Sequence, residues 1–211
     1  MAGPINFRVE IDEGQIAHVN KMLYTTPEKA RIVFRDAINR GLKAGETQAR
    51  REIRERYAIT NKNLMDYSSV KMSSAEAMGS DVIGSIHFAG GKIPLYKFHP
   101  SPRDRKYTNR FVNGRSGWRV TTPVRAEDAK ANGLQLLSRG FIATFRSGHK
   151  GIFQRAGGRT KTGRERIKEY WGFSMPDMLD YPEAREEIEA RMEEITAKRI
   201  DQELTRILNG F

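Results

Sequence analysis

Serine and histidine are the residues whose types and spacing first suggest chemistry, in Ser147-Gly148-His149 at the centre of GFIATFRSGHKGIFQRAG (140–157). A serine nucleophile needs a histidine base within hydrogen-bond reach and an acid that orients the histidine. No carboxylate occurs from residue 139 to residue 164, and the Gly-x-Ser-x-Gly pattern of the hydrolase nucleophile is missing. Serine hydrolysis is therefore not expected, and His149 is interpreted as a turn or interface residue of a β-hairpin.

The sequence has no local motif for binding a metal ion or a phosphate. The chain has no cysteine, and no two of its four histidines lie three to five residues apart, so local metal-ligand spacing is missing. GGRTKTG at 157–163 is followed by Arg164 rather than by the Lys-Ser/Thr pair of a phosphate-binding loop, which indicates a flexible basic loop. We expect no metal, no cofactor and no catalytic residue. A metal-dependent nuclease that uses His99 or His149 is the enzymatic alternative.

Positive charge is concentrated in two segments of a chain whose formal net charge is +11 and whose isoelectric point is about 10.0. Segment 103–119 contains six cationic residues and one acid, and segment 139–168 contains nine cationic residues and one acid. This regional excess indicates a polyanionic partner, either nucleic acid or an acidic protein surface; the alternative is a solvated basic face that aids solubility. The candidate contacts to a neighbouring subunit or to DNA are Arg103, Arg105, Lys106, Arg110, Arg115, Lys150, Arg155, Arg159, Lys161 and Arg164.

The elements that position these residues follow from apolar periodicity. Alternation predicts a half-buried strand over 5–11, closed by a turn at 12–14. A helix is predicted from Thr26-Pro27 to about residue 57, and another over 182–208. Gly41 and Gly45 indicate a close crossing of the first helix against the sheet, or a bend. A short helix is predicted at 61–67, and further strands at 68–72, 82–88, 93–98, 117–124, 140–146 and 151–155.

The predicted fold class is α+β, a mostly antiparallel sheet packed against the long N-terminal helix. The domain boundaries are 1–181 for the α+β domain and 182–211 for a C-terminal helix that packs on it or on a neighbouring subunit. Segments 99–117 and 155–166 are expected to be long basic surface loops. Phe141, Phe145 and Trp118 are expected in the core, while Tyr107 and Phe111 fit either core or base stacking. The chain has no apolar run long enough for a membrane span and no signal-peptide pattern at its N-terminus, so we expect cytoplasmic synthesis.

Three blocks of the chain form one pattern. The first block is Ile93-Pro94-Leu95 with Phe98, the second comprises Phe141-Ile142-Ala143, Ser147-Gly148-His149 and Gly151-Ile152-Phe153-Gln154-Arg155, and the third comprises Trp171-Gly172, Ser174-Met175-Pro176 and Met178. In this order the blocks resemble the mid-chain strand, the signature hairpin and the closing element of the minor tail protein Z family of lambda-like tailed bacteriophages. The resemblance covers about residues 28–208. It departs from the family before the closing element, where the family has Leu-Pro-Ile and Arg166-Ile167 lacks the proline.

The resemblance implies a non-enzymatic virion protein at the head-proximal end of the tail, which completes the tail for head joining and positions the genome end in the tail channel. It implies a fold related to tail-completion and tail-terminator proteins, and a homo-oligomeric ring, a hexamer being one option. The implied partners are the tail terminator, the tail tube or the head–tail connector, with genomic DNA in the channel and no membrane. A free nucleic-acid-binding protein without sequence preference is the alternative function.

Overall fold

The computed structural model describes residues 3–11, 13–23, 27–78, 81–104, 107–112, 115–120 and 123–209. The fold is α+β, with antiparallel sheets, a long helix near the N-terminus and a C-terminal helix. The chain divides into two compact units that are described separately. The first comprises Met1–Glu52, Ser68–Gly90 and Met175–Phe211, and the second comprises Ile53–Tyr67 and Gly91–Ser174.

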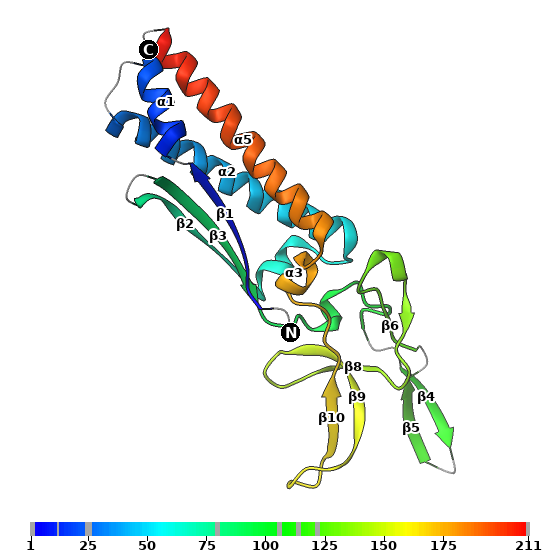
Figure 1. Ribbon diagram of the computed structural model, residues 1–211. Coiled ribbons are helices and arrows are strands. Elements are labelled where there is room, and N and C mark those ends of the chain that lie inside the picture. The colour runs from blue at the N-terminus through cyan, green and yellow to red at the C-terminus, as the bar shows by residue number, and fades with distance from the viewer. Residues whose placement is uncertain are drawn as a thin grey trace. The chain divides into compact units, whose positions relative to one another are not determined.

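The first unit contains a three-stranded antiparallel sheet (Figure 1). Its strand order is β1-β3-β2, with β1 at Ile5–Ile11, β3 at Asp81–Gly90 and β2 at Ser68–Met78. In β1 the side chains of Ile5, Phe7 and Ile11 are buried, and Phe7 lies opposite Ile86 of β3. The predicted strand over 5–11 is confirmed, because alternate apolar residues face one side of the sheet.

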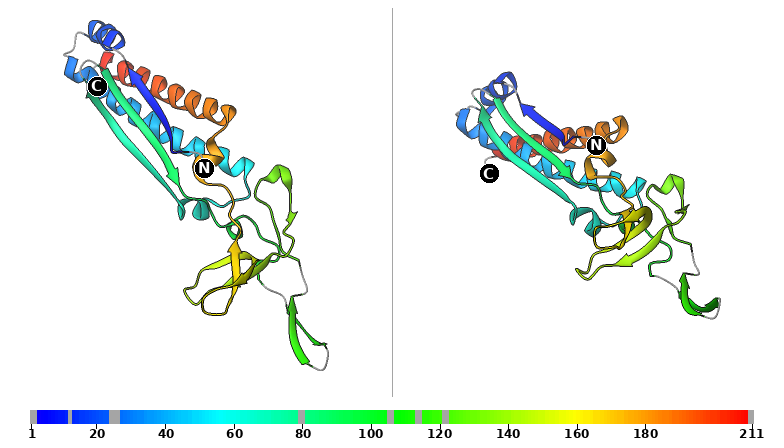
Figure 2. Two further views of the ribbon diagram at one scale, coloured as in Figure 1. Left: turned by 60° about the horizontal axis from the view of Figure 1, so that its bottom comes forward. Right: turned by 90° about the horizontal axis from the view of Figure 1, so that it is seen from below.

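Helices α2 (Pro27–Arg56) and α5 (Pro182–Leu208) run side by side in the first unit (Figures 1 and 2). A Cβ atom at Gly41 would lie 2.8 Å from the backbone oxygen of Met192, and one at Gly45 would lie 2.5 Å from the Met192 side chain. The two glycines therefore permit a close crossing, but against α5 and not against the sheet. The predicted bounds of both helices are confirmed to within one residue; Thr26, the predicted N-cap, lies outside the described residues.

Helix α1 (Glu13–Leu23) begins where the sequence predicts a turn. Ile16 and Val19 lie one helical turn apart and are both buried, which places this face of α1 in the core of the first unit. The prediction of a turn at 12–14 was wrong beyond Asp12, which lies outside the described residues. Gly14 and the polar residues around it are typical of a turn, and the helical spacing of Ile16 and Val19 is too short a pattern to outweigh them.

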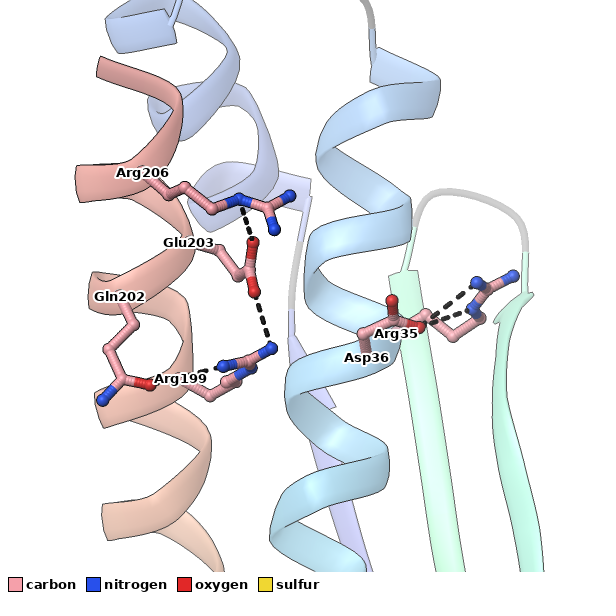
Figure 3. A network of polar contacts seen from close by, with 6 residues as sticks. All are labelled: Arg35, Asp36, Arg199, Gln202, Glu203 and Arg206. Carbon is pink, nitrogen blue, oxygen red and sulfur yellow. Dashed lines mark hydrogen bonds and ion pairs between the residues drawn. The ribbon is translucent and has the colours of Figure 1, made fainter. Parts of the chain in front are cut away.

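The C-terminal half of α5 carries a network of charged side chains (Figure 3). The carboxylate of Glu203, whose side chain is 12% exposed, accepts from Arg199 at 2.7 Å and from Arg206 at 3.3 Å. Such contacts between residues three or four apart stabilise a helix modestly. Arg35 and Asp36 of α2 form a separate pair in the same figure.

The second unit is built from short strands and turns. Its main sheet has the order β10-β9-β8, with β8 at Phe141–Thr144, β9 at Lys150–Arg159 and β10 at Glu165–Glu169. Helix α3 (Asn61–Met65) is capped by the Thr60 side chain. Two further antiparallel pairs are β4 (Tyr107–Val112) with β5 (Arg115–Val120), and β6 (Arg125–Ala126) with β7 (Gln135–Leu136); η1 (Leu95–Lys97) and η2 (Lys130–Asn132) are single 3-10 turns.

Several predictions for the second unit were wrong. The strand predicted at 93–98 is the 3-10 turn η1 flanked by extended residues, because the buried Ile93, Leu95 and Phe98 combine spacings of two and three. The loop predicted at 99–117 contains strand β4 and the first half of β5. The loop predicted at 155–166 continues β9 to Arg159 and begins β10 at Glu165.

Candidate functional site

A basic β-ribbon extends from the main sheet of the second unit. Strand β8 pairs with β9 only from Lys150 to Phe153, whereas β9 pairs with β10 as far as Arg159. Beyond Phe153 the ribbon is therefore two-stranded, as the paired β9 and β10 arrows show (Figure 1). We name residues 155–168 the basic arm.

Glycines set the shape of the basic arm. Arg155 lies opposite Ile167 and Arg159 opposite Glu165, so β9 has three residues between these pairs and β10 has one. The extra residues form a bulge in which Gly157 and Gly158 adopt φ values of +74° and +71°, a region that glycine enters without a Cβ clash. The sequence pattern that suggested a loop is thus the pattern of a bulged hairpin.

A tight turn closes the arm. The Thr160 amide donates to the Arg164 carbonyl at 2.7 Å, and the Gly163 amide donates to the Thr160 carbonyl at 2.9 Å. Gly163 has a φ of +77°, again in the left-handed region. The turn holds Lys161 at the end of the ribbon, between Arg159 and Arg164.

Every residue from 155 to 168 is exposed. The arm has six cationic residues and one acid, Glu165, which forms an ion pair with Arg155. The Arg155 guanidinium also lies 5.8 Å from the centre of the Phe141 ring. Within the described part of the chain, no acidic side chain pairs with the remaining cations of the arm, which are Arg159, Lys161, Arg164, Arg166 and Lys168.

The other predicted contact residues lie elsewhere in the second unit. Arg110 is in β4 and Arg115 begins β5, and their side chains are outside the described part of the structure. Arg105 and Lys106 also lie outside the described residues. Of the ten predicted residues, Arg155, Arg159, Lys161 and Arg164 come together in the arm, whereas Arg103 and Lys150 lie at a second place near Tyr96.

Lys150 is held by side chains and is not a free cation. Its ammonium pairs with the Asp104 carboxylate and lies 5.1 Å from the centre of the Tyr96 ring. The pKa of Lys150 is raised above its ordinary value of 10.5, mainly by the hydrogen bond to Asp104 and to a smaller extent by the hydrogen bond to Tyr96. Lys150 is therefore better suited to fixing segment 99–104 on the sheet than to binding an external anion.

His149 has a carboxylate partner that the sequence does not reveal. Its Nε2 lies 2.8 Å from Oε1 of Glu169, a residue of β10 whose side chain is only 13% exposed. A Cβ atom at Gly151 would lie 2.9 Å from the Phe153 ring and would collide with this carboxylate, so the glycine makes room for the pair. Within the described residues, no hydrogen bond links Ser147 to His149, and the pair serves to join the β8–β9 turn to β10.

Phe145 was expected in the core, but its side chain is exposed. It is 42% exposed, whereas Ile142 of β8 and both Ile152 and Phe153 of β9 are buried. Phe145 lies past the end of β8 and packs its ring against Phe153 at 4.9 Å. Phe141 is half-buried, and the side chains of Trp118, Tyr107 and Phe111 are outside the described part of the structure.

The arrangement supports electrostatic binding more readily than a reaction. Within the described residues, no three His, Asp or Glu side chains gather as a metal-ligand set, and no helix is long and apolar enough to cross a membrane. An exposed two-stranded ribbon with unpaired cations can contact phosphates or carboxylates without reading a base sequence. No family model, curated protein or solved structure matches the chain.

Proposed function

We propose that this chain is a structural subunit of a tailed bacteriophage, which completes the head-proximal end of the tail, joins it to the head and lies beside the genome end in the channel. On this proposal the chain is not an enzyme. It assembles as a ring in the virion and contacts the tail terminator, the tail tube or the connector through surfaces that include the basic arm.

The observation that carries the proposal is that the three blocks of family resemblance meet in space. The Gly172 amide donates to the Ile93 carbonyl at 2.8 Å, and the Ile93 amide donates to the Phe173 carbonyl at 3.2 Å. The Tyr170 amide donates to the Ile152 carbonyl at 2.9 Å, which links the closing element to the hairpin block. Residues that are 18 to 80 positions apart in the sequence thus share one set of backbone hydrogen bonds.

The glycines within these blocks have packing roles. A Cβ atom at Gly172 would lie 2.6 Å from the Phe98 ring, which belongs to the first block. Gly151 makes room for Phe153 and Glu169 in the same way. The residue types that carry the resemblance are therefore those that this packing requires, which supports a shared fold rather than a chance match of common residues.

A gene-deletion phage tests the proposal. We expect cells infected by the deletion phage to accumulate filled heads and separate tails, with few joined particles in electron micrographs, and expression of the intact chain in trans to restore joining. Joined, infectious particles at the parental level in the deletion phage would contradict the proposal.

The basic arm favours one further candidate function, a free nucleic-acid-binding protein without sequence preference. The five cations of the exposed ribbon that have no acidic partner among the described residues would contact successive phosphates, and the sequence has no base-reading motif. This function predicts DNA binding by the isolated chain that weakens steeply with salt and is abolished by charge reversal at Arg155, Arg159 and Lys161. Affinity that stays constant from low to moderate salt would contradict it.

A further inference from the structure

A cavity of about 300 Å³ opens in the second unit, away from the residues of the basic arm. It lies between the start of α3, the 3-10 turn η1 and the segment after η1. Three basic side chains, two hydroxyl groups and one amide contribute to the lining, and no carboxylate of the described residues does. The lining residues are Thr60, Asn63, Tyr96, Lys97, His99, Pro100 and Arg103.

Two of the three basic side chains of the cavity, Lys97 and Arg103, have no ion-pair partner among the described residues. Lys97 places its ammonium 5.8 Å from the centre of the Tyr67 ring, a contact that leaves its charge intact. Nδ1 of His99 is 3.9 Å from the nearest Glu127 oxygen, at the limit of an ion pair. The Arg103 guanidinium forms no ion pair within the described residues. Lys97 and Arg103 therefore place positive charge at a concave site with hydrogen-bond donors, while the Glu127 carboxylate lies beside His99.

The backbone that carries His99 and Arg103 is anchored. Ser101 exchanges two backbone hydrogen bonds with Arg125, at 2.8 and 2.7 Å. The Tyr96 hydroxyl donates to the Arg103 carbonyl at 3.0 Å, which fixes the main chain and leaves the guanidinium free to bind a ligand. Arg103 and His99 thus lie on an anchored segment and not on a loose loop, which lowers the entropic cost of binding.

His99 has a strained backbone. Its φ of +28° lies outside the regions that a residue with a Cβ adopts readily. Residues held in such conformations cluster at binding and catalytic sites, because the surrounding structure must impose them. Phe98, which is fully buried, holds the chain immediately before His99.

We propose that this cavity is a binding site for a phosphate group. Arginine and lysine donors together with the Thr60 hydroxyl suit the oxygens of a phosphate group, and no carboxylate among the described lining residues would repel such a ligand. The volume is at the small end of ligand sites, enough for one phosphate group and part of what it is attached to. The phosphate is either inorganic or a monoester, or else one phosphodiester of a nucleic acid. The site goes beyond the proposed virion role and does not depend on it.

Calorimetric titration of the full-length chain in a phosphate-free buffer tests the site, with inorganic phosphate as one probe and an oligothymidylate without terminal phosphate as the other. Arg103→Gln and Lys97→Gln are the test variants. Lys92→Gln removes one charge from an exposed lysine of the same unit that does not line the cavity, and serves as the matched control. Circular dichroism and a thermal melt check that each variant folds.

We expect each test variant to weaken binding at least about tenfold, because a charge-assisted hydrogen bond is lost. We expect the Lys92→Gln control to change binding by less than about twofold. Saturable binding of inorganic phosphate with this pattern identifies a free phosphate or monoester ligand. The same pattern with the oligonucleotide alone identifies a phosphodiester. If neither probe binds, or if Lys92→Gln weakens binding as much as Arg103→Gln, the proposal is overturned.

Discussion

Neutralising three cations of the basic arm, as Arg159→Gln, Lys161→Gln and Arg164→Gln in one variant, should reduce the salt dependence of DNA binding. These three side chains are exposed and lie at the turn end of the ribbon, where no acid of the described residues pairs with them. Each cation that neutralises a DNA phosphate releases condensed counterions, and this release makes the affinity depend on salt.

The magnitude follows from the number of unpaired cations in the arm. If all five contact phosphates of duplex DNA, the slope of log K against log salt is about −4.5, at about −0.9 per contact. Removing three contacts should leave a slope of about −1.8. Arg155 is not counted, because its guanidinium pairs with Glu165.

The assay is fluorescence anisotropy with one labelled duplex over a series of salt concentrations. The matched control neutralises Lys21, Lys92 and Lys198 together, three exposed lysines outside the arm, and therefore changes the net charge by the same amount. We expect the control to keep a slope near that of the unchanged chain. An equal loss of slope in both variants would refute the assignment of DNA contacts to the arm, and so would a slope that does not change in the arm variant.

Three further predictions concern stability. Gly45→Leu should lower the free energy of unfolding in urea by about 1–3 kcal/mol or more, because the new side chain overlaps Met192 where α2 crosses α5. The raised pKa of Lys150 contributes fully to the stability of the fold below pH 10.5, and this contribution is lost as the pH rises through the higher folded-state pKa. Asp104→Asn removes the first cause of the raised pKa. The variant should therefore show a smaller fall in the free energy of unfolding in urea above pH 10.5. His149→Ala should cost about 1–3 kcal/mol in the same assay, because a largely buried carboxylate loses its hydrogen-bond partner.

Each of these predictions has a control variant or an outcome that would contradict it. Gly91→Leu adds the same side chain where no atom lies within 4 Å of the new Cβ, and should change stability little. His149→Gln restores a donor for Glu169 and should recover part of the loss seen with alanine. Equal stability of Gly45→Leu and the unchanged chain would contradict the close helix crossing. Identical alkaline profiles for Asp104→Asn and the unchanged chain would contradict the assigned cause of the Lys150 shift.

The long elements could be predicted from the sequence because their signals are local. Pro27 and Pro182 mark the starts of α2 and α5, and apolar stripes continue along both helices. The strand β1 shows strict alternation over seven residues. In each case one face of one element is buried, so periodicity alone is sufficient.

The bounds of the hairpins in the second unit could not be predicted, because glycine-rich, charged sequence occurs both in loops and in exposed or bulged strands. Gly157 and Gly158 form a bulge within a ladder, although their sequence is typical of a loop. Asn113-Gly114 is a hairpin signal between β4 and β5, and could have corrected the loop predicted at 99–117. An exposed ribbon also lacks the buried face that periodicity detects.

The polar contacts of the site could not be predicted, because they depend on strand register and on the path of the chain between distant segments. His149 and Glu169 are 20 residues apart, and Lys150 and Asp104 are 46 residues apart. Nothing in either local sequence indicates these contacts. The phosphate cavity likewise combines residues from 60–63 with residues from 96–103, which no single motif joins. The enzymatic alternative is a metal-dependent nuclease that uses His99 or His149, whereas the place of His99 in the cavity lining favours binding an anion.

The most direct test of the tail-completion proposal is complementation in vitro. Extracts of cells infected by the deletion phage would be mixed with the purified chain, and infectious particles would be counted by plaque assay. The proposal predicts that the intact chain restores plaques by joining the accumulated heads and tails, in proportion to the amount of chain added. Heads and tails that remain separate in the presence of the folded, purified chain, with no rise in plaques, would contradict the proposal.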